Sequence, residues 1–451
     1  MAASLDTFNG DSKKDVDVAE VPSPTASVVD DYDSKAAKVA YRKADKRILL
    51  FYSIVYLFMR INVSNITNTA IINIDEGDGI KKQLGNLTSS QWAWVISVFY
   101  YPYLFAEPAS TLLLKQFTPS VWMSRIMITW GAISMCQAAT KNYAGIIAAS
   151  VRIILDMHLD EKLLTMIKGS LRQTPHCVSL FSMHAGSIPA ILFGIYAFFL
   201  LPNYPETSKW LTDPERKIIL DNLPKTQPSS KARTWDVEQV KALFKNPTTI
   251  TFTLIWVCHA IGGWGVSTVL PTVIYELGLT GSAITQLLTM PTYGFGCFCL
   301  VVFGWLIQRR IFQPWLTAMC LEVITCVCYI LLIVIRNPIA KYCLLSIAIS
   351  CSICIYPILW PERIRAAHGT TTAGLAIGLT NAAAQFSGIV GPQVFQSRFG
   401  PTYKVSYSAS IGLLVGAILS IAASWYLVRK QDRREKAREE DAYGQAQQSG
   451  A

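Results

Sequence analysis

Residues 313–335 read QPWLTAMCLEVITCVCYILLIVI, and Glu322 is the only charged side chain among them. About 20 consecutive apolar residues form a helix long enough to cross a lipid bilayer, so this stretch predicts a membrane-spanning helix. Comparable runs lie on both sides of it, at about 48–70, 90–114, 120–140, 178–201, 247–272, 284–308, 339–360, 370–394 and 403–428. Together they predict an all-α polytopic protein of about ten spans, embedded in the lipid bilayer.

The composition agrees with this class. Of the 451 residues, 51% are hydrophobic and 16% are charged, whereas soluble proteins carry about 25% charged residues. These values exclude a water-soluble enzyme and a secreted disulfide scaffold. The net charge is +10, and basic residues gather before the first apolar run and after the last. Basic flanks favour the cytoplasmic side, so we expect both termini there and no nucleic-acid partner.

The 11 cysteines lie mostly in or near apolar runs. Pairs such as Cys297 with Cys299 lack the second pair and the histidine of a zinc site. We interpret them as small residues that pack between helices, and we expect neither a metal ion nor a cofactor.

The chain divides into five parts. Residues 1–47 form a polar cytoplasmic tail, 48–201 a first bundle, 202–246 a central cytoplasmic loop, 247–428 a second bundle and 429–451 a C-terminal tail. The second bundle has six spans, but the first has four clear ones and an irregular stretch at 143–177. There, 13 apolar residues are followed at once by Asp156, His158, Asp160, Glu161 and Lys162, which would be costly to bury in lipid. Two halves around a polar loop are typical of secondary transporters.

One motif indicates a family. Residues 201–211, LPNYPETSKWL, resemble the P-x-x-P-E-T-x-x-W-L signature of the fungal anion:cation symporters of the major facilitator superfamily, which include allantoate, pantothenate and nicotinate permeases. Similar matches occur at 65–70, 107–115, 304–309 and 388–392, so the likeness covers about 48–142 and 178–430. Asn62, Val63 and Gln308 depart from the family pattern, and 143–177 stands in place of its fourth and fifth spans.

The resemblance implies a major-facilitator-type two-bundle fold whose first bundle lacks two spans. It also implies a monomeric plasma-membrane transporter, not an enzyme, that couples uptake of a small organic anion to protons by alternating access. The anion would be a carboxylate vitamin or an allantoate-like compound. The alternatives are a transport-inactive, truncated or mis-spliced family member, or a sensor-like membrane protein. A membrane enzyme lacks support because no nucleophile–base pair, metal cluster or phosphate loop stands out.

Arg60 is the leading candidate for binding the anion. It lies about 12 residues into the first span, near the bilayer centre, where an unpaired guanidinium is costly. Alternatively, Arg60 is a structural partner of Glu107 or of a helix carbonyl. Helical spacing puts further polar side chains on the same face, and these could instead form interhelical hydrogen bonds. The candidate substrate-binding residues are Arg60, Ser64, Asn65, Asn68, Tyr103, Tyr293, Tyr356, Asn381 and Gln385.

Three further residues are candidates for proton coupling or gating. Glu107 lies near the inner end of the second span, where the family counterpart contributes to a gate. His259 lies well inside a span, and histidine is the residue type whose ordinary charge change suits a proton gradient, although a membrane histidine also serves as a helix-packing donor. Arg309 belongs to the loop motif of the second half, which the resemblance associates with gating. Glu322 has no role in this interpretation.

Overall fold

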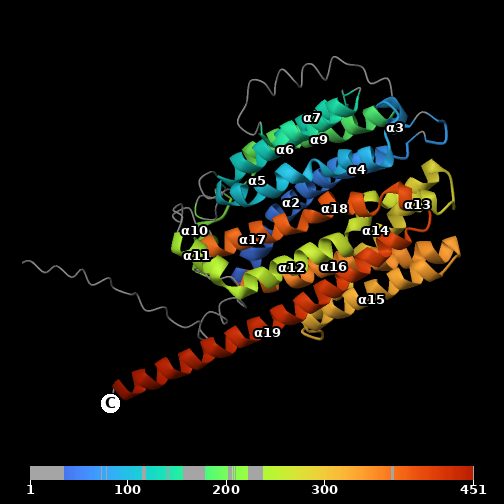
Figure 1. The fold of residues 1–451 in the computed structure, drawn as a ribbon. Helices are drawn as coiled ribbons and strands as arrows, with labels where there is room; N and C mark the ends of the chain where they lie inside the picture. The colour runs from blue at the N-terminus through green and yellow to red at the C-terminus, as the bar shows by residue number, and fades with distance from the viewer. Residues whose placement is uncertain are drawn as a thin grey trace, which may run out of the picture.

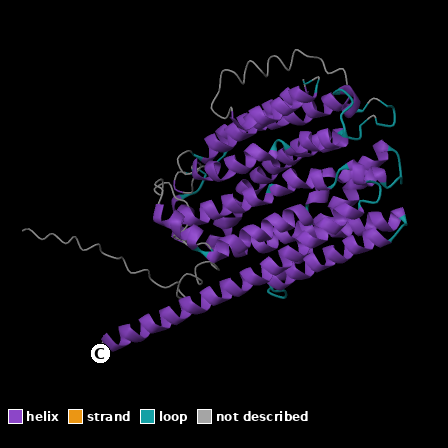
Figure 2. Ribbon diagram, in the orientation of Figure 1, coloured by secondary structure: helices purple, strands orange, loops and turns teal. Residues whose placement is uncertain are grey.

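The computed structural model describes residues 35–449 except 73, 78, 114–117, 139, 141, 156–177, 202–205, 207, 209, 222–236 and 367–369. All regular structure in the described part of the chain is helical, and the helices lie as roughly parallel rods (Figures 1 and 2). The expected all-α fold is confirmed.

The first half of the chain forms one group of helices, drawn blue to green in Figure 1. They are α2 (Lys35–Thr69), α3 (Ile80–Gln83), α4 (Ser89–Ser97), α5 (Tyr100–Leu113), α6 (Pro119–Ala138), α7 (Tyr143–Leu155) and α9 (Val178–Leu200). Helix α6 packs against α9, and α9 against α2. The contact between these three helices is apolar, with Phe51, Val55, Met127, Ala197 and Leu201 buried in it.

The second half forms the other group, drawn yellow to red. It consists of α12 (Pro247–Gly262), η2 (Gly265–Val269), α13 (Leu270–Glu276), α14 (Ser282–Gln308), α15 (Pro314–Val334), α16 (Pro338–Arg365), α17 (Thr370–Ala384), α18 (Phe386–Val394), η3 (Ser397–Phe399) and α19 (Lys404–Ser449). Between the halves lie the short helices α10 (Asp213–Asp221) and α11 (Val237–Lys245), at one end of the rods.

Local sequence signals set several helix starts. The Asn246 side chain accepts a hydrogen bond from the Thr248 amide at 3.0 Å, and Pro247 occupies the first turn of α12. Asn337 caps α16 in the same way through the Ile339 amide at 2.9 Å, again followed by a proline. Such residues satisfy backbone amides that lack a helical partner. Both helices therefore begin where an asparagine–proline pair ends the preceding polar turn.

The stretch 143–177 differs from the expectation in its first part. Residues 143–155, expected to be irregular, form helix α7, which packs against α6, α4 and α5. A buried hydrogen bond from Gln137 Nε2 to Ser150 Oγ, 2.9 Å long, joins α6 to α7. Tertiary packing thus supports a helix that its own 13 residues make too short to cross a membrane, since they span about 20 Å. The charged cluster at 156–162 lies outside the described residues.

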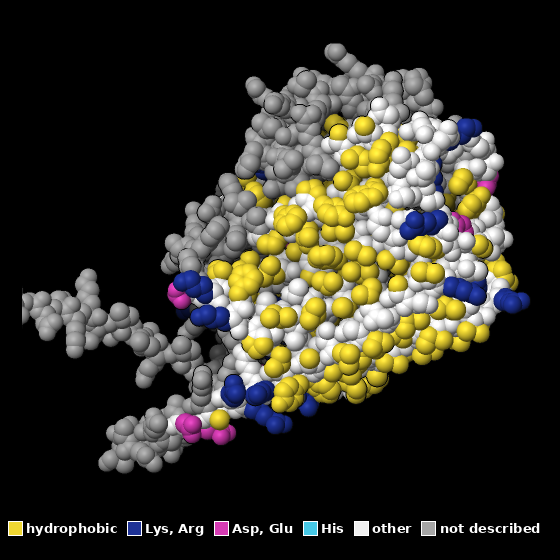
Figure 3. Space-filling model, in the orientation of Figure 1, with side chains coloured by type: hydrophobic (Ala, Val, Ile, Leu, Met, Phe, Trp, Pro, Cys, Tyr) yellow, Lys and Arg dark blue, Asp and Glu magenta, His cyan; other side chains and the backbone are white. Residues whose placement is uncertain are grey.

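Five described segments are long and apolar enough to cross a membrane: Pro247–Glu276, Ser282–Gln308, Pro314–Val334, Pro338–Arg365 and Lys404–Arg434. The other expected spans coincide with α2, α4–α5, α6, α9 and α17–α18, several of which are broken or shorter. Large apolar side chains such as Phe105, Phe199 and Leu419 are more than 60% exposed. Figure 3 shows apolar side chains over the middle of one face and charged ones towards its ends, as expected for a lipid-facing surface.

The two halves meet mainly along two pairs of helices. Helix α5 packs against α17, and α4 packs against α18. A large apolar cluster extends across the α4–α18 region, with Trp92, Val95 and Phe395 buried in it. Between these contacts the chain leaves a central cavity.

Candidate functional site

The cavity has a volume of about 980 Å³ and is lined by both halves of the chain. From the first half come α2, α4, α5 and α6; from the second come Trp264 after α12, then η2, α13, α14, α16, α17 and α18. Its polar lining includes Tyr56, Arg60, Thr67, Asn68, Tyr100, Tyr103, Ser134, Gln137, Ser267, Thr268, Thr289, Tyr293, Tyr356, Asn381, Gln385 and Ser387. A wall that combines aromatic side chains with hydroxyl and amide groups can surround a small molecule and offer it hydrogen bonds.

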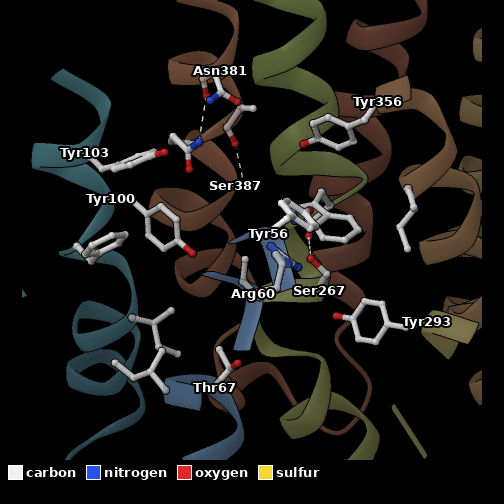
Figure 4. A pocket seen from close by; sticks show the side chains of 18 of the residues that line it. Tyr56, Arg60, Thr67, Tyr100, Tyr103, Ser267, Tyr293, Tyr356, Asn381 and Ser387 are labelled. Atoms are coloured by element: carbon white, nitrogen blue, oxygen red, sulfur yellow. Dashed lines mark hydrogen bonds between the residues drawn. The ribbon is translucent and has the colours of Figure 1, made fainter. Parts of the chain in front are cut away.

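Arg60 lies at the centre of this cavity, between Tyr100, Ser267 and Tyr293 (Figure 4). It is the one charged side chain among the described lining residues, and it forms no ion pair with a described residue. Its guanidinium carbon is 5.9 Å from the centre of the Trp264 ring, which is within the range of a cation–π interaction. The arrangement leaves a positive charge available to a ligand.

A break in a helix brings Trp264 to the cavity. Helix α12 ends at Gly262, and the His259 carbonyl accepts from the amides of both Gly263, at 2.8 Å, and Trp264, at 3.2 Å. The chain then enters the 3-10 turn η2, whose Gly265 packs against Gly391 of α18. A Cβ on Gly391 would lie 2.9 Å from the Gly265 carbonyl oxygen, so this approach requires glycine. Non-helical backbone at membrane depth is typical of transporter binding sites.

The structure brings seven of the nine sequence-predicted binding residues to this cavity. They are Arg60, Asn68, Tyr103, Tyr293, Tyr356, Asn381 and Gln385. The backbone of Ser64 and Asn65 belongs to α2, but their side chains lie outside the described part. Contact with the cavity does not test substrate binding, so the roles of all nine residues stay predictions.

The three predicted coupling or gating residues are not cavity-lining. Glu107 accepts a hydrogen bond from Asn381 Nδ2 at 2.5 Å, rather than pairing with Arg60. His259 is fully buried and bonded to Glu322 at 2.7 Å. Arg309 ends α14 and lies over the ring of Trp305, 5.7 Å from its centre. The described contacts of Arg309 are thus with its own helix, and its gating role stays a prediction.

Sequence reasoning missed several lining residues, above all Trp264, Ser267, Thr268, Trp130 and Gln137. The glycines at 262, 263 and 265 were the available signal, because they indicate where a helix can bend. Gln137 gave a weaker signal, as an amide inside an apolar run. Tyr100 also lines the cavity beside the expected Tyr103, whereas Tyr101, between them in the sequence, is 37% exposed and stacks on the Trp94 ring.

A pair of helical bundles with a polar cavity between them defines a membrane transporter. Comparison with solved structures supports the fold. A bacterial homologue of the human lysosomal transporter Spinster, in an inward-facing and unoccupied conformation, matches with a TM-score of 0.55 and 11% identity over 84% of this chain and 97% of that one. The occupied form matches with a TM-score of 0.54. At this identity the likeness concerns the fold alone.

Sequence comparison relates the chain to membrane transporters. The family model of the Major Facilitator Superfamily matches residues 180–392. An uncharacterized transporter of Schizosaccharomyces pombe is 22% identical, with 86% of each chain covered. The MFS transporter prlL of a fungal species is 26% identical over 84% of each chain, and the MFS-type transporter cnsO of Penicillium expansum is 24% identical over 89% of this chain and 86% of its own. Together these findings support a multi-pass membrane transporter of the major facilitator superfamily.

Proposed function

We propose that this transporter is a symporter that moves a small organic anion together with protons. The observation that carries the proposal is Arg60, a guanidinium in the central cavity without an ion pair to a described residue. A charge at this depth is costly unless it has a partner. A carboxylate substrate would supply that partner and accept two parallel hydrogen bonds from the guanidinium.

The rest of the cavity suits such a ligand. Its volume of about 980 Å³ is at the upper end of the range of small-molecule sites, about 300–1,000 Å³. Tyr100 and Tyr293 present hydroxyl groups towards the same space as Arg60 (Figure 4), and Trp264 supplies a flat apolar surface beside the guanidinium. The substrate class that fits is a compact carboxylate with a planar or amide-bearing body, in agreement with the resemblance to vitamin and allantoate permeases.

We further propose transport by alternating access at the plasma membrane, by a monomer with both termini in the cytoplasm. Positive charges near both ends support this orientation. Because the matched relatives are named as transporters, the alternative of a transport-inactive or sensor-like protein is not favoured.

Uptake of labelled carboxylates tests the proposal. Cells that express the chain are offered nicotinate, pantothenate and allantoate at two external pH values, and we expect faster uptake of one of them at the lower pH. Arg60→Gln removes a charged hydrogen bond worth about 1.5–3 kcal/mol, which corresponds to about a 10- to 150-fold rise in KM. Arg60→Lys keeps the charge but loses the geometry for two parallel hydrogen bonds. Its KM should therefore rise less than that of Arg60→Gln.

Arg336→Gln, at an exposed arginine of the turn between α15 and α16, is the matched control and should transport normally. Uptake that is unchanged in Arg60→Gln would remove Arg60 from the binding site. Uptake that is indifferent to pH for every substrate would overturn proton coupling.

A further inference from the structure

His259 and Glu322 form a sealed ionisable pair within the second bundle. His259 lies in the last turn of α12 and Glu322 in the middle of α15, and His259 Nδ1 is 2.7 Å from Glu322 Oε1. Both side chains are 0% exposed. Among the described residues, His259 Nε2 and Glu322 Oε2 have no hydrogen-bond partner. The pair therefore has one internal bond and two unsatisfied polar atoms in an apolar bundle.

We propose that His259 and Glu322 together bind the transported proton, as one coupled unit outside the substrate cavity. This inference rests on the proposed function, which requires a proton site but leaves its place open. It also gives a role to Glu322.

The energetics favour a site that binds a proton over a purely structural link. Each buried polar atom without a partner costs about 1–3 kcal/mol, and a link that served stability alone would be better replaced by apolar side chains. With one proton the pair is neutral overall, as imidazolium–carboxylate or as imidazole–carboxylic acid. Without it, a lone carboxylate would remain in an apolar surrounding, which is far less stable. The pair therefore holds a proton while sealed and releases it when water reaches it.

The position of His259 at the end of α12 strengthens the binding. The carbonyl groups of the last helical turn carry partial negative charge and favour a cation nearby. The His259 carbonyl already accepts from two amides where the helix breaks. The carbonyl of Gly263, just after the end of the helix, accepts a hydrogen bond from Tyr329 Oη at 3.1 Å. A shift of this break would change the environment of the pair, so the proton site and the cavity wall share one movable segment.

A continuous series of edge-to-face ring contacts and one cation–π contact joins the pair to Arg60. The ring of Tyr356 lies 5.3 Å from that of His259 and 6.2 Å from that of Trp264, centre to centre. Trp264 in turn lies 5.9 Å from the Arg60 guanidinium. Tyr356, Trp264 and Arg60 all line the cavity. An anion bound at Arg60 would therefore press on the same aromatic groups that cover the proton site.

In the described part of the chain, the other titratable groups around the pair are thiols and phenols, which leaves the pair itself as the proton-binding site. Those that interact electrostatically with Glu322 are Cys258 of α12, Cys326 and Tyr329 of α15, and Cys351 and Tyr356 of α16. From α19, Tyr407 packs on Tyr329. Thiols and phenols ordinarily stay protonated at neutral pH. The sequences of η2, α17 and α18 contain no titratable residue, and the charged residues of α11 lie at the far end of α12.

Infrared spectroscopy can detect the proton without any substrate. In the purified full chain in lipid nanodiscs, difference spectra recorded between about pH 5 and 8 should show the loss of a band of the protonated pair, either a carboxylic-acid carbonyl or an imidazolium ring mode. Glu322→Gln keeps the hydrogen bond to His259 but should abolish the band. Glu362→Gln should leave the band intact. Glu362 is the matched control because it, too, is a glutamate bonded to a ring nitrogen of a neighbouring helix, accepting from Trp315 Nε1 at 3.1 Å. His259→Gln, a second variant, should leave Glu322 protonated throughout this range.

Transport in proteoliposomes supplies the second readout. We expect Glu322→Gln to keep substrate counterflow within about threefold of the native rate and to lose accumulation driven by a pH gradient. A pair that merely braces two helices would show no titration in the native chain, and that result, or accumulation retained in Glu322→Gln, overturns the inference. If the native chain titrates but transports none of the offered anions, the proposed function fails while proton binding at the pair stands.

Discussion

The side-chain amide of Asn381 on α17 donates a hydrogen bond of 2.5 Å to Glu107 on α5, so the two halves of the chain are joined through a carboxylate. The residues are 274 positions apart in the sequence. Because α5 and α17 form one of the principal contacts between the halves, this bond holds one end of the cavity together. Separation of the bundles at this end must break it.

Replacement of either partner should weaken the contact between the halves. We expect Asn381→Ala and Glu107→Gln each to lower the free energy of unfolding by about 1–2 kcal/mol, because hydrogen bonds to charged groups contribute about 1.5–3 kcal/mol. SDS-induced unfolding of the native chain, the two single variants and the double variant gives the coupling energy between the two residues, which we expect to be about 1 kcal/mol. Ser387→Ala, which removes a bond within one segment, serves as the control, and strictly additive effects would show that the two residues act independently.

A second link joins the halves at the opposite end. Asp75, which follows α2, accepts from Tyr275 Oη at 2.7 Å and from the Ser282 amide at 2.8 Å. The Ser282 amide bond, followed by the tyrosine bond, lowers the pKa of the Asp75 carboxyl below its ordinary value. A carboxyl group with a lowered pKa stabilises the joined state above its ordinary pKa and loses that contribution as the pH falls through the lowered value.

This end should therefore be insensitive to pH in the physiological range. Spin labels at the exposed positions Ser90 and Ala283 report the distance between the two halves at this end by pulsed electron resonance. We expect the same distance distribution from pH 8 to pH 5, a longer one in Asp75→Asn, and opening of the native chain only well below about pH 4. The neighbouring Glu76→Gln should behave as the native chain. A transition near neutral pH would mean that another group controls this end.

Close packing at Gly388 offers a test of the contact between α5 and α18. A Cβ at Gly388 would overlap the ring of Tyr100. Gly388→Ala should therefore lower the free energy of unfolding by about 1–3 kcal/mol, as overpacking does. Gly412→Ala on α19 has nothing within 4 Å of its added methyl and should be neutral or slightly stabilising. Thermal unfolding compares the two variants, and Tyr100→Ala should restore the stability of Gly388→Ala.

The sequence predicted best what depends on composition along one helix. The apolar run at 313–335 became α15, Pro314–Val334, since a span is defined by its own residues. Arg60, which its position in an apolar run puts near the bilayer centre, lines the cavity, because a single guanidinium in such a run has few stable positions, but its binding role stays a prediction. Helix breaks were harder to predict: the runs at 247–272 and 370–394 each divide where another helix packs closely.

The His259–Glu322 pair shows why the remainder could not be predicted. The two residues are 63 positions apart, and neither carries a local signal of the other. Glu322 stood alone in an apolar run, so its partner depended on how α12 and α15 face each other. Likewise, Trp264 reaches the cavity only because α12 stops two residues earlier.

Helix α19 runs without interruption for 46 residues, which corresponds to about 69 Å. A bilayer core is only about 30 Å thick, so this rod is much longer than the lipid requires. Figure 1 shows the C-terminal part of α19 running beyond the other helices. Since α19 packs on α12 and α15, it moves with them as a lever arm. A rotation of about 15°, comparable to known subunit rotations, about an axis at the far end of α19 would carry its tip through roughly 18 Å, so a fluorophore there would report a small rocking of the second bundle as a large displacement outside the membrane.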